Sequence, residues 1–368
     1  DCSYNNLWTL GISKGNVLNM AAYIGNQIEH LNCSNNDIES LSTSCAKNLD
    51  CSNNNINSLY VSSSVLQNLD YTDNPLSDLT LINCPASVSV KNFDEYLVGL
   101  TDLTLVQFPI DALNFPMESR IENLEIQDCP SLANIECLGT PLKTLAVNGC
   151  ANLSSIDVGA SALEELTLSD CENLYSLNCS HTRLKELNAS GLPSLSTIDC
   201  SYNNDLEKID ASNCGNLMEL DCQNGALKSL SIANCGKLRS LDCSSNSLQV
   251  LDLTTNSGLV HLNCASNQVS VLELRNCKNL SKIDCRNNEI ERLYVASFPE
   301  LSYLDCSHNP MTALDAGNCA SLDTLYCANG DLASLNVAND TLLRVLDCSN
   351  NQLNKLDVGF FSRLEDLG

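Results

Sequence analysis

The residues of this chain that could do chemistry are its 22 cysteines and the aspartates that stand beside them. Thiolates bind zinc, but zinc sites use close pairs such as C-x-x-C, which the sequence lacks. A nucleophilic cysteine needs partial exposure and a neighbouring base. Here the cysteines follow leucines in an alternating pattern, as in "LRVLDCSNNQL" (343–353), which places them in a core. We therefore expect reduced thiols with a structural role.

A row of carboxylates occupies the position just before the cysteine in successive copies of this pattern, and Asn263 and Tyr326 interrupt it. Its members are Asp199, Asp221, Asp242, Asp284, Asp305 and Asp347. Charges about 4.8 Å apart, one strand spacing, repel each other and attract cations. Calcium or a basic partner is one interpretation of the row. The alternative is a solvated strand face whose aspartates bond neighbouring Ser, Asn and backbone groups. Neither an EF-hand loop nor a glycine-rich calcium repeat is present.

A second group of side chains interrupts the acidic row and should face the same side of the strands. It consists of His261, Lys282, Arg286, Tyr303, His308 and Tyr326. Tyr and Arg are frequent anchors of protein interfaces. We predict that this group, called the 261–326 patch below, binds a partner; an unremarkable polar face is the alternative. The other histidines, His30 and His181, lie several turns away, so a histidine metal site is not expected.

Catalytic signatures are missing from the sequence. It has no Gly-rich phosphate loop, G-x-S-x-G or H-E-x-x-H motif, and no nucleophile–base pair with sequence support. The formal charge of −26 makes nucleic acid and anionic membranes poor partners. No run approaches the roughly 18 apolar residues of a membrane span. We expect a non-catalytic protein without a cofactor or a transmembrane segment.

The cysteines recur because the sequence is a tandem repeat of 21 residues, with one step of 22. The main row is Cys179, Cys200, Cys222, Cys243, Cys264, Cys285, Cys306, Cys327 and Cys348. Val158 and Cys137 continue it backwards, followed with irregular steps by Phe115, Val90, Tyr71, Cys51, Cys33 and Cys2. A second, incomplete row contains Cys129, Cys150, Cys171, Cys214, Cys235, Cys277 and Cys319. Strand spacing would allow disulfides, but a uniform ladder offers no unique pairing.

Each turn reads L-x-x-L-x-C-x-x-N-x-L-x-x-L-x-V. The L-x-C part has the period of a half-buried strand. The asparagine should satisfy buried backbone groups where the strand turns away. The L-x-x-L-x-V part is too short for a multi-turn helix, so we expect it to be extended or weakly strand-like, approaching a second sheet.

This pattern resembles the leucine-rich repeat, and in particular the bacterial internalin type and its 21-residue, cysteine-bearing subclass represented by internalin J. The resemblance implies a curved, right-handed solenoid with a parallel β-sheet on its concave face and few helices. We expect one repeat domain over 1–368, with about 17 turns. Irregular segments are expected at 8–27, as a short helix or loop, and at 75–121. The four aromatics Phe93, Tyr96, Phe108 and Phe115 should fill an irregular core, with a local binding epitope as the alternative.

The resemblance also implies a bacterial surface or secreted protein whose concave face recognises a protein or glycan, in adhesion or host interaction. A passive spacer in a longer surface protein is the alternative. Because capping turns are not evident, we expect a fragment of a longer chain. A monomer is expected.

Overall fold

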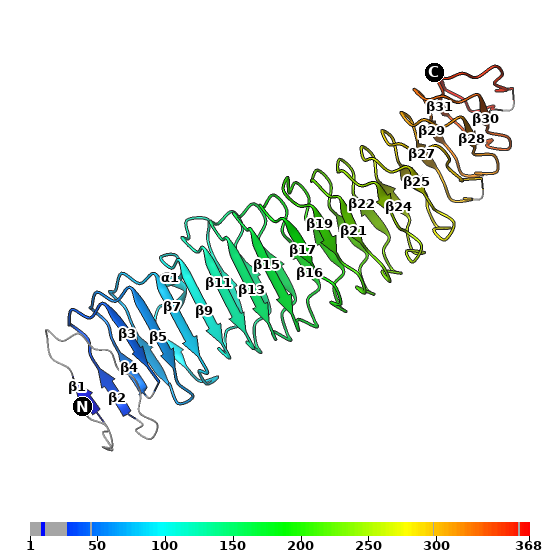
Figure 1. Ribbon diagram of the computed structural model, residues 1–368. Helices are drawn as coiled ribbons and strands as arrows, with labels where there is room; N and C mark the ends of the chain where they lie inside the picture. The colour runs from blue at the N-terminus through cyan, green and yellow to red at the C-terminus, as the bar shows by residue number, and fades with distance from the viewer. Residues whose placement is uncertain (1–8, 12–27, 45, 297, 360) are drawn as a thin grey trace. The chain divides into compact units, whose positions relative to one another are not determined.

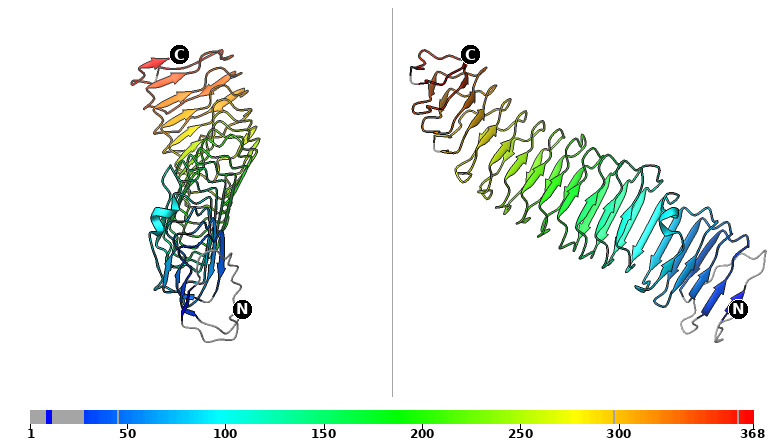
Figure 2. Two further views of the ribbon diagram at one scale, coloured as in Figure 1. Left: turned by 90° about the vertical axis from the view of Figure 1, so that its left-hand side faces the viewer. Right: turned by 180° about the vertical axis from the view of Figure 1, so that it is seen from behind.

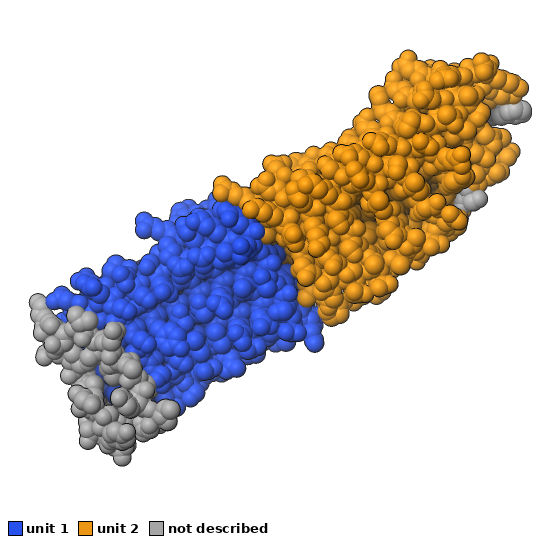
Figure 3. Space-filling model, in the orientation of Figure 1, with its two compact units in different colours: residues 1–174 blue, residues 175–368 orange. Residues whose placement is uncertain are grey.

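The computed structural model describes residues 9–11, 28–44, 46–296, 298–359 and 361–368. Two compact units, residues 1–174 and 175–368, make up the chain (Figure 3). Within each unit, short strands stack one above another (Figure 1), and every pair that forms is parallel. The predicted leucine-rich repeat solenoid is thus confirmed.

In each unit, one side carries strands that end just before a residue of the main cysteine row. We call the sheet on this side the cysteine sheet, and in unit 1 it has two parts. Its first part is β1 (Thr9–Gly11), β2 (Ile28–Asn32), β4 (Ala46–Asp50), β6 (Asn68–Asp70) and β8 (Ser89–Val90). Its second part is β10 (Ala112–Asn114), β12 (Asn134–Glu136) and β14 (Ser155–Asp157). Cys2 and most of the predicted irregular segment 8–27 lie outside the described residues; only β1 falls within that segment.

The opposite side of unit 1 carries a second sheet with longer strands. These are β3 (Ser40–Thr43), β5 (Ser58–Ser62), β7 (Asp78–Ile82), β9 (Asp102–Val106), β11 (Asn123–Gln127), β13 (Thr144–Asn148) and β15 (Glu165–Ser169). Leu and Val alternate inward along them, as in the buried pair Leu145 and Val147. The expected second sheet is therefore present, and from β5 onwards its strands have five residues, whereas those of the cysteine sheet from β6 onwards have two or three.

Unit 2 has the same plan. Its cysteine sheet is β16 (Ser176–Asn178), β18 (Thr197–Asp199), β20 (Glu219–Asp221), β22 (Ser240–Asp242), β24 (His261–Asn263), β26 (Lys282–Asp284), β27 (Tyr303–Asp305), β29 (Thr324–Tyr326), β31 (Val345–Asp347) and β32 (Asp366–Leu367). The other side has β17 (Glu186–Asn188), β19 (Lys208–Asp210), β21 (Ser229–Ser231), β23 (Val250–Leu251), β25 (Val271–Leu272), β28 (Ala313–Asp315) and β30 (Ser334–Asn336).

The segment 75–121 keeps the solenoid but interrupts the cysteine sheet. Between β8 and β10 the chain forms α1 (Phe93–Leu97), which lies outside the stacked strands of unit 1 (Figure 2), while β7 and β9 continue the second sheet in register. The ring of Phe93 stacks on buried Phe108 at 5.6 Å, and Tyr96 meets Tyr71 edge-on at 5.1 Å. The aromatics therefore fill an irregular core.

One predicted member of the main cysteine row is wrong. The register pairs Val90 with Leu69, two positions before Tyr71, so Val90 is a core-strand residue and does not occupy the cysteine position. By this register the cysteine position belongs to Asn92, a regular 21 residues after Tyr71, and the insertion with α1 begins only after it. Phe115 is placed correctly, because Asn114 pairs with Glu136 and so Phe115 stands beside Cys137.

All 20 cysteines in the described part of the chain are buried, and none of them is in a disulfide. Burial raises the pKa of Cys264 to about 12, with nearby Asp284 and Asp242 adding to the shift. Such thiols are neutral and pack as small apolar groups. This agrees with the structural role expected for them.

Candidate binding face of the cysteine sheet

The predicted 261–326 patch is assembled by the register of four neighbouring strands. His261 on β24 pairs with Lys282 on β26, which in turn pairs with Tyr303 on β27. Two residues further along these strands, Asp305 pairs with Tyr326 of β29. A repeat of constant length aligns equivalent residues, so the side chains form two parallel rows on one face of the sheet.

Arg286 stands just beyond Cys285, where the strand turns away. Its Nε lies 3.6 Å from Oδ2 of Asp284, and its Nη1 lies 3.5 Å from Oδ2 of Asp305 on the next turn. These distances are long for charge-assisted hydrogen bonds. Asp305 is 4% exposed, whereas the Arg286 side chain is 49% exposed. The guanidinium therefore balances two carboxylates while leaving donors free for a partner.

Two tyrosines give the patch its apolar surface. The rings of Tyr303 and Tyr326 meet edge-on with centroids 6.1 Å apart, and both side chains are half-buried. Partial burial, together with the charges of Asp305 and Asp284, raises the pKa of Tyr303. Its hydroxyl thus stays protonated and can donate a hydrogen bond.

His308 lies apart from the two strand rows, in the turn after β27. Its backbone is left-handed (φ 54°), and a ring nitrogen lies 3.2 Å from Nδ2 of Asn329. The structure thus brings four of the six predicted residues onto adjacent strands and places Arg286 and His308 in the turns that follow β26 and β27.

The acidic row is aligned as predicted, and its carboxylates cap the turns that follow the strands. Oδ1 of Asp199 accepts from the backbone N–H and the hydroxyl of Ser201 at 3.0 and 2.7 Å. In the other five turns, Oδ1 of the equivalent aspartate likewise accepts the backbone N–H of the residue two positions later. These aspartates are Asp221, Asp242, Asp284, Asp305 and Asp347. These bonds fit the structural interpretation of the row.

Charge still accumulates along this row. Burial raises the pKa of Asp221, and the charges of Asp242 and Asp199 raise it further. Burial also raises the pKa of Asp284, with a contribution from Asp305. The strands β16, β18, β20 and β22 line a groove of about 490 Å³, which contains Asp199, Asp221 and Asp242 of the row and also Glu219. The face is therefore acidic over β16 to β22, whereas Lys282 and Arg286 bring positive charge to it in the 261–326 patch.

No cluster of three or more His, Cys, Asp or Glu side chains that could hold a metal is found among the described residues. One carboxylate per turn, spaced along a ladder and bonded to its own turn, does not surround a cation. Calcium binding at this row therefore stays a prediction.

Two features of the face were missed by the sequence analysis. The rings of His181 and Tyr202 stack at 4.5 Å with an angle of 3° between their planes, and both residues have left-handed backbones. In unit 1, β2, β4, β6 and β8 line a groove of about 680 Å³ with a mixed polar and apolar surface, which includes His30, Asn48 and Lys91. The polar residues at equivalent repeat positions were the signal that could have revealed this groove.

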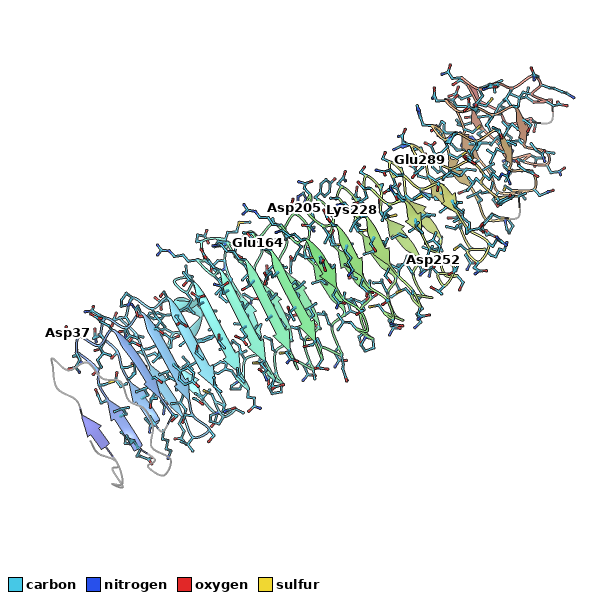
Figure 4. The ribbon with its side chains drawn as sticks, viewed as in Figure 1. Asp37, Glu164, Asp205, Lys228, Asp252 and Glu289 are labelled. Carbon is cyan, nitrogen blue, oxygen red and sulfur yellow. The ribbon has the colours of Figure 1, made fainter. Side chains whose placement is uncertain are left out.

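The chain's surface also carries ion pairs between consecutive turns. Lys228, labelled in Figure 4, lies 2.7 Å from Glu207, and Lys143 lies 2.6 Å from Glu122. Exposed pairs of this kind stabilise little. In the described part of the chain, no helix is long and apolar enough to cross a membrane.

Comparison with known proteins identifies the fold. No family model and no curated protein match the sequence. Among solved structures, the functional domain of InlJ from Listeria monocytogenes, which includes a cysteine ladder, is similar with a TM-score of 0.59 and 24% identity over 74% of this chain. The match covers 58% of that InlJ chain, less than two thirds.

Two further structures share the architecture. YopM, a leucine-rich effector protein from Yersinia pestis, has a TM-score of 0.51 and 23% identity, covering 85% of this chain and 82% of YopM. The leucine-rich repeat protein LIC12759 from Leptospira interrogans has a TM-score of 0.50 and 21% identity, covering 83% and 78%. The chain therefore has the leucine-rich repeat fold, with a buried cysteine ladder of the kind that the InlJ domain includes.

Proposed function

We propose that this chain is a non-catalytic binding module that recognises a protein or glycan partner through the outer face of its cysteine sheet, centred on the 261–326 patch. The observation that carries the proposal is the registered row of His261, Lys282 and Tyr303. It places an exposed histidine, an exposed lysine and a half-buried tyrosine side by side, next to the acidic row. Tyr303 and the neighbouring Arg286 are of residue types that are enriched at binding surfaces.

The setting of this module is a monomeric, surface-exposed or secreted bacterial protein that acts in adhesion or host interaction. This rests on the likeness to internalin-type repeats and is an argument by analogy. A partner with carboxylates or sulfates opposite the patch and basic groups opposite the acidic row would match the charges of the sheet. The second candidate is a passive spacer, which the regular stacking of turns would equally serve.

The test compares the wild type with a triple variant, Lys282→Glu/Arg286→Gln/Tyr303→Ala. Glutamine replaces Arg286 because a new carboxylate would face Asp284 and Asp305. Both proteins are immobilised and exposed to host-cell protein extracts and to a glycan array, with and without calcium. A ligand bound by the wild type and lost in the triple variant supports the proposal.

A matched control carries the same kinds of change on the other side of unit 2: Lys208→Glu/Arg292→Gln/Tyr294→Ala. All three side chains are exposed there. Circular dichroism of each variant checks that the fold is retained. Ligands that bind all three proteins equally would contradict the patch, and the absence of any ligand would favour the spacer.

A further inference from the structure

A second row of buried side chains runs through unit 2, one per turn. Phe298 and Phe361 fill the position with apolar rings, whereas its thiol and amide members act as hydrogen-bond donors. Five of them donate to a backbone carbonyl 24 or 25 residues earlier, on the preceding turn. The pairs are Cys214 to Ala189 (3.0 Å), Cys235 to Ala211 (3.1 Å), Asn256 to Ile232 (2.9 Å), Cys277 to Leu253 (3.7 Å) and Cys319 to Val295 (3.1 Å). Where a polar side chain fills this position, it is thus a thiol or amide that donates in each of these five turns.

Asp340 occupies this position one turn after Cys319. Its side chain is fully buried, and neither carboxyl oxygen has a hydrogen-bond partner. By the spacing of the row, the carbonyl that it should serve is that of Ala316. An ionised carboxylate can only accept hydrogen bonds, whereas a carboxylic acid has one O–H to donate. Only the protonated form of Asp340 can therefore donate a hydrogen bond to the preceding turn, as the other polar members of the row do.

The surroundings offer an ionised Asp340 little compensation. The backbone N–H groups of Asn318 and Cys319 are close enough to favour ionisation somewhat, but they already donate to Ala338 and Ala316. The titratable groups on the preceding turn are the Cys319 thiol, whose pKa is raised to about 11, and the carboxylate of Asp315.

The following turn offers no charge at this position. The equivalent residue there is Phe361, which is buried and apolar. Burial, aided by the charge of Asp315, raises the pKa of Asp340 to about 7. An unpartnered carboxylate in such a site carries the desolvation cost of a buried charge.

We propose that Asp340 is a proton-operated clasp: the protonated side chain closes the turn at 337–343 against the turn at 316–319, and ionisation loosens that contact. The direction with pH follows from linkage. Because the folded form holds the proton more tightly than the open form, the closed state is most stable below pH 4 or so, the usual range for an exposed carboxyl. That stability falls as the pH rises and is lost by about pH 7. Loosening would give solvent access to Cys319.

Amide hydrogen exchange of the reduced, full chain between pH 5 and 9 tests this, with wild type and Asp340→Asn compared at each pH. The asparagine side chain can donate a hydrogen bond at every pH in this range, as Asn256 does in the same row. We expect the wild-type to variant ratio of exchange rates in 334–347 to rise by up to about tenfold per pH unit until about pH 7 and then to level. Asp331→Asn is the control at an exposed site. The ratio of its exchange rates to those of the wild type should not change with pH.

The reciprocal change, Asn256→Asp, tests the same idea in an otherwise wild-type chain and does not depend on whether the Asp340 variant folds. It should transfer the pH dependence to the turns around 232–259. Faster exchange there with rising pH supports the clasp. A wild-type to Asp340→Asn ratio that stays constant from pH 5 to 9, or an Asn256→Asp chain without added pH dependence, would overturn it.

Discussion

The side-chain amide of Asn309 lies 3.0 Å from the carbonyl oxygen of Cys285, which belongs to the preceding turn. The same Nδ2 also reaches the carbonyls of Cys306 and Ser307, and Oδ1 accepts the N–H of Ile290 at 3.0 Å. One buried side chain thus satisfies backbone groups on two turns at once. The same arrangement recurs at Asn246, Asn267, Asn288 and Asn351.

We expect Asn309→Ala to lower the local free energy of opening by about 2–3 kcal/mol, because it leaves buried carbonyls without donors. Hydrogen exchange of residues 285–310 measures this locally, which suits a repeat protein whose turns need not unfold together. Asn279→Ala is the control, since its amide is exposed, its backbone is not left-handed, and its Nδ2 donates to the carbonyl of Ser257 at 3.3 Å. Equal effects of the two substitutions would contradict a special role for the buried asparagine.

Asp221 should be a source of repulsion within the acidic row at neutral pH. Its pKa is raised by burial and by Asp242 and Asp199, so ionisation lowers stability as the pH rises from 4 or so towards neutrality. Asp221→Asn keeps an acceptor for the N–H of Gln223. We expect a gain of about 0.5 kcal/mol at low salt, shrinking at high salt.

Urea denaturation at pH 7, in low and high sodium chloride, measures that gain. Asp252→Asn is the contrasting variant, because hydrogen bonds from Thr254 lower the pKa of Asp252 and so favour its charged form. That variant should lose stability or leave it unchanged. A loss for Asp221→Asn at low salt would refute the expected repulsion.

The stacked rings of His181 and Tyr202 should be energetically coupled. Aromatic pairs contribute about 0.5–1.5 kcal/mol beyond the area they bury. Asparagine occupies this left-handed position in other turns, for example at Asn224, so His181→Asn and Tyr202→Asn remove the rings without new backbone strain. A double-mutant cycle of unfolding free energies should return a coupling of about 0.5–1 kcal/mol, and a value near zero would show that the stack is incidental.

Most of the fold could be predicted because a constant repeat length determines the register. Once Cys285 and Cys306 are known to stand 21 residues apart, the neighbours of Lys282 and Tyr303 follow, and so does the row that they share. The role of the asparagine also followed, since a buried turn needs donors and acceptors that apolar residues lack. The same periodicity located the acidic row.

The misplacement of Val90 shows the limit of this reasoning. The cysteine position of this turn is held by a polar residue, Asn92, and only strand pairing reveals that the apolar Val90 lies two positions before it. The second row of thiols posed a different problem. Its gaps were visible in the sequence, but that Asp340 fills one of them without a partner depends on burial and hydrogen bonding in three dimensions.

The main cysteine row should make the protein sensitive to alkali. Burial raises the pKa of Cys137, Cys264 and Cys327 to about 12 each, whereas an exposed thiol has a pKa near 8.5. The folded chain therefore keeps protons that the unfolded chain releases, so stability is complete below about pH 8.5 and falls as the pH rises towards 12. Each such thiol contributes a slope of up to about 1.4 kcal/mol per pH unit in this window.

Replacing one thiol isolates its share of that slope from the ionisation of Tyr and Lys. At pH 7, Cys264→Ala should cost about 1 kcal/mol, because it removes the buried sulfur and leaves a small cavity. Between pH 9 and 11, under reducing conditions, the free-energy difference between wild type and variant should shrink and then change sign, since only the wild type carries the thiol that must stay protonated. Urea denaturation at each pH, supported by hydrogen exchange around 262–267, follows the difference. A difference that stays constant up to pH 11 would mean that the buried thiol ionises as easily as an exposed one, which its complete burial argues against.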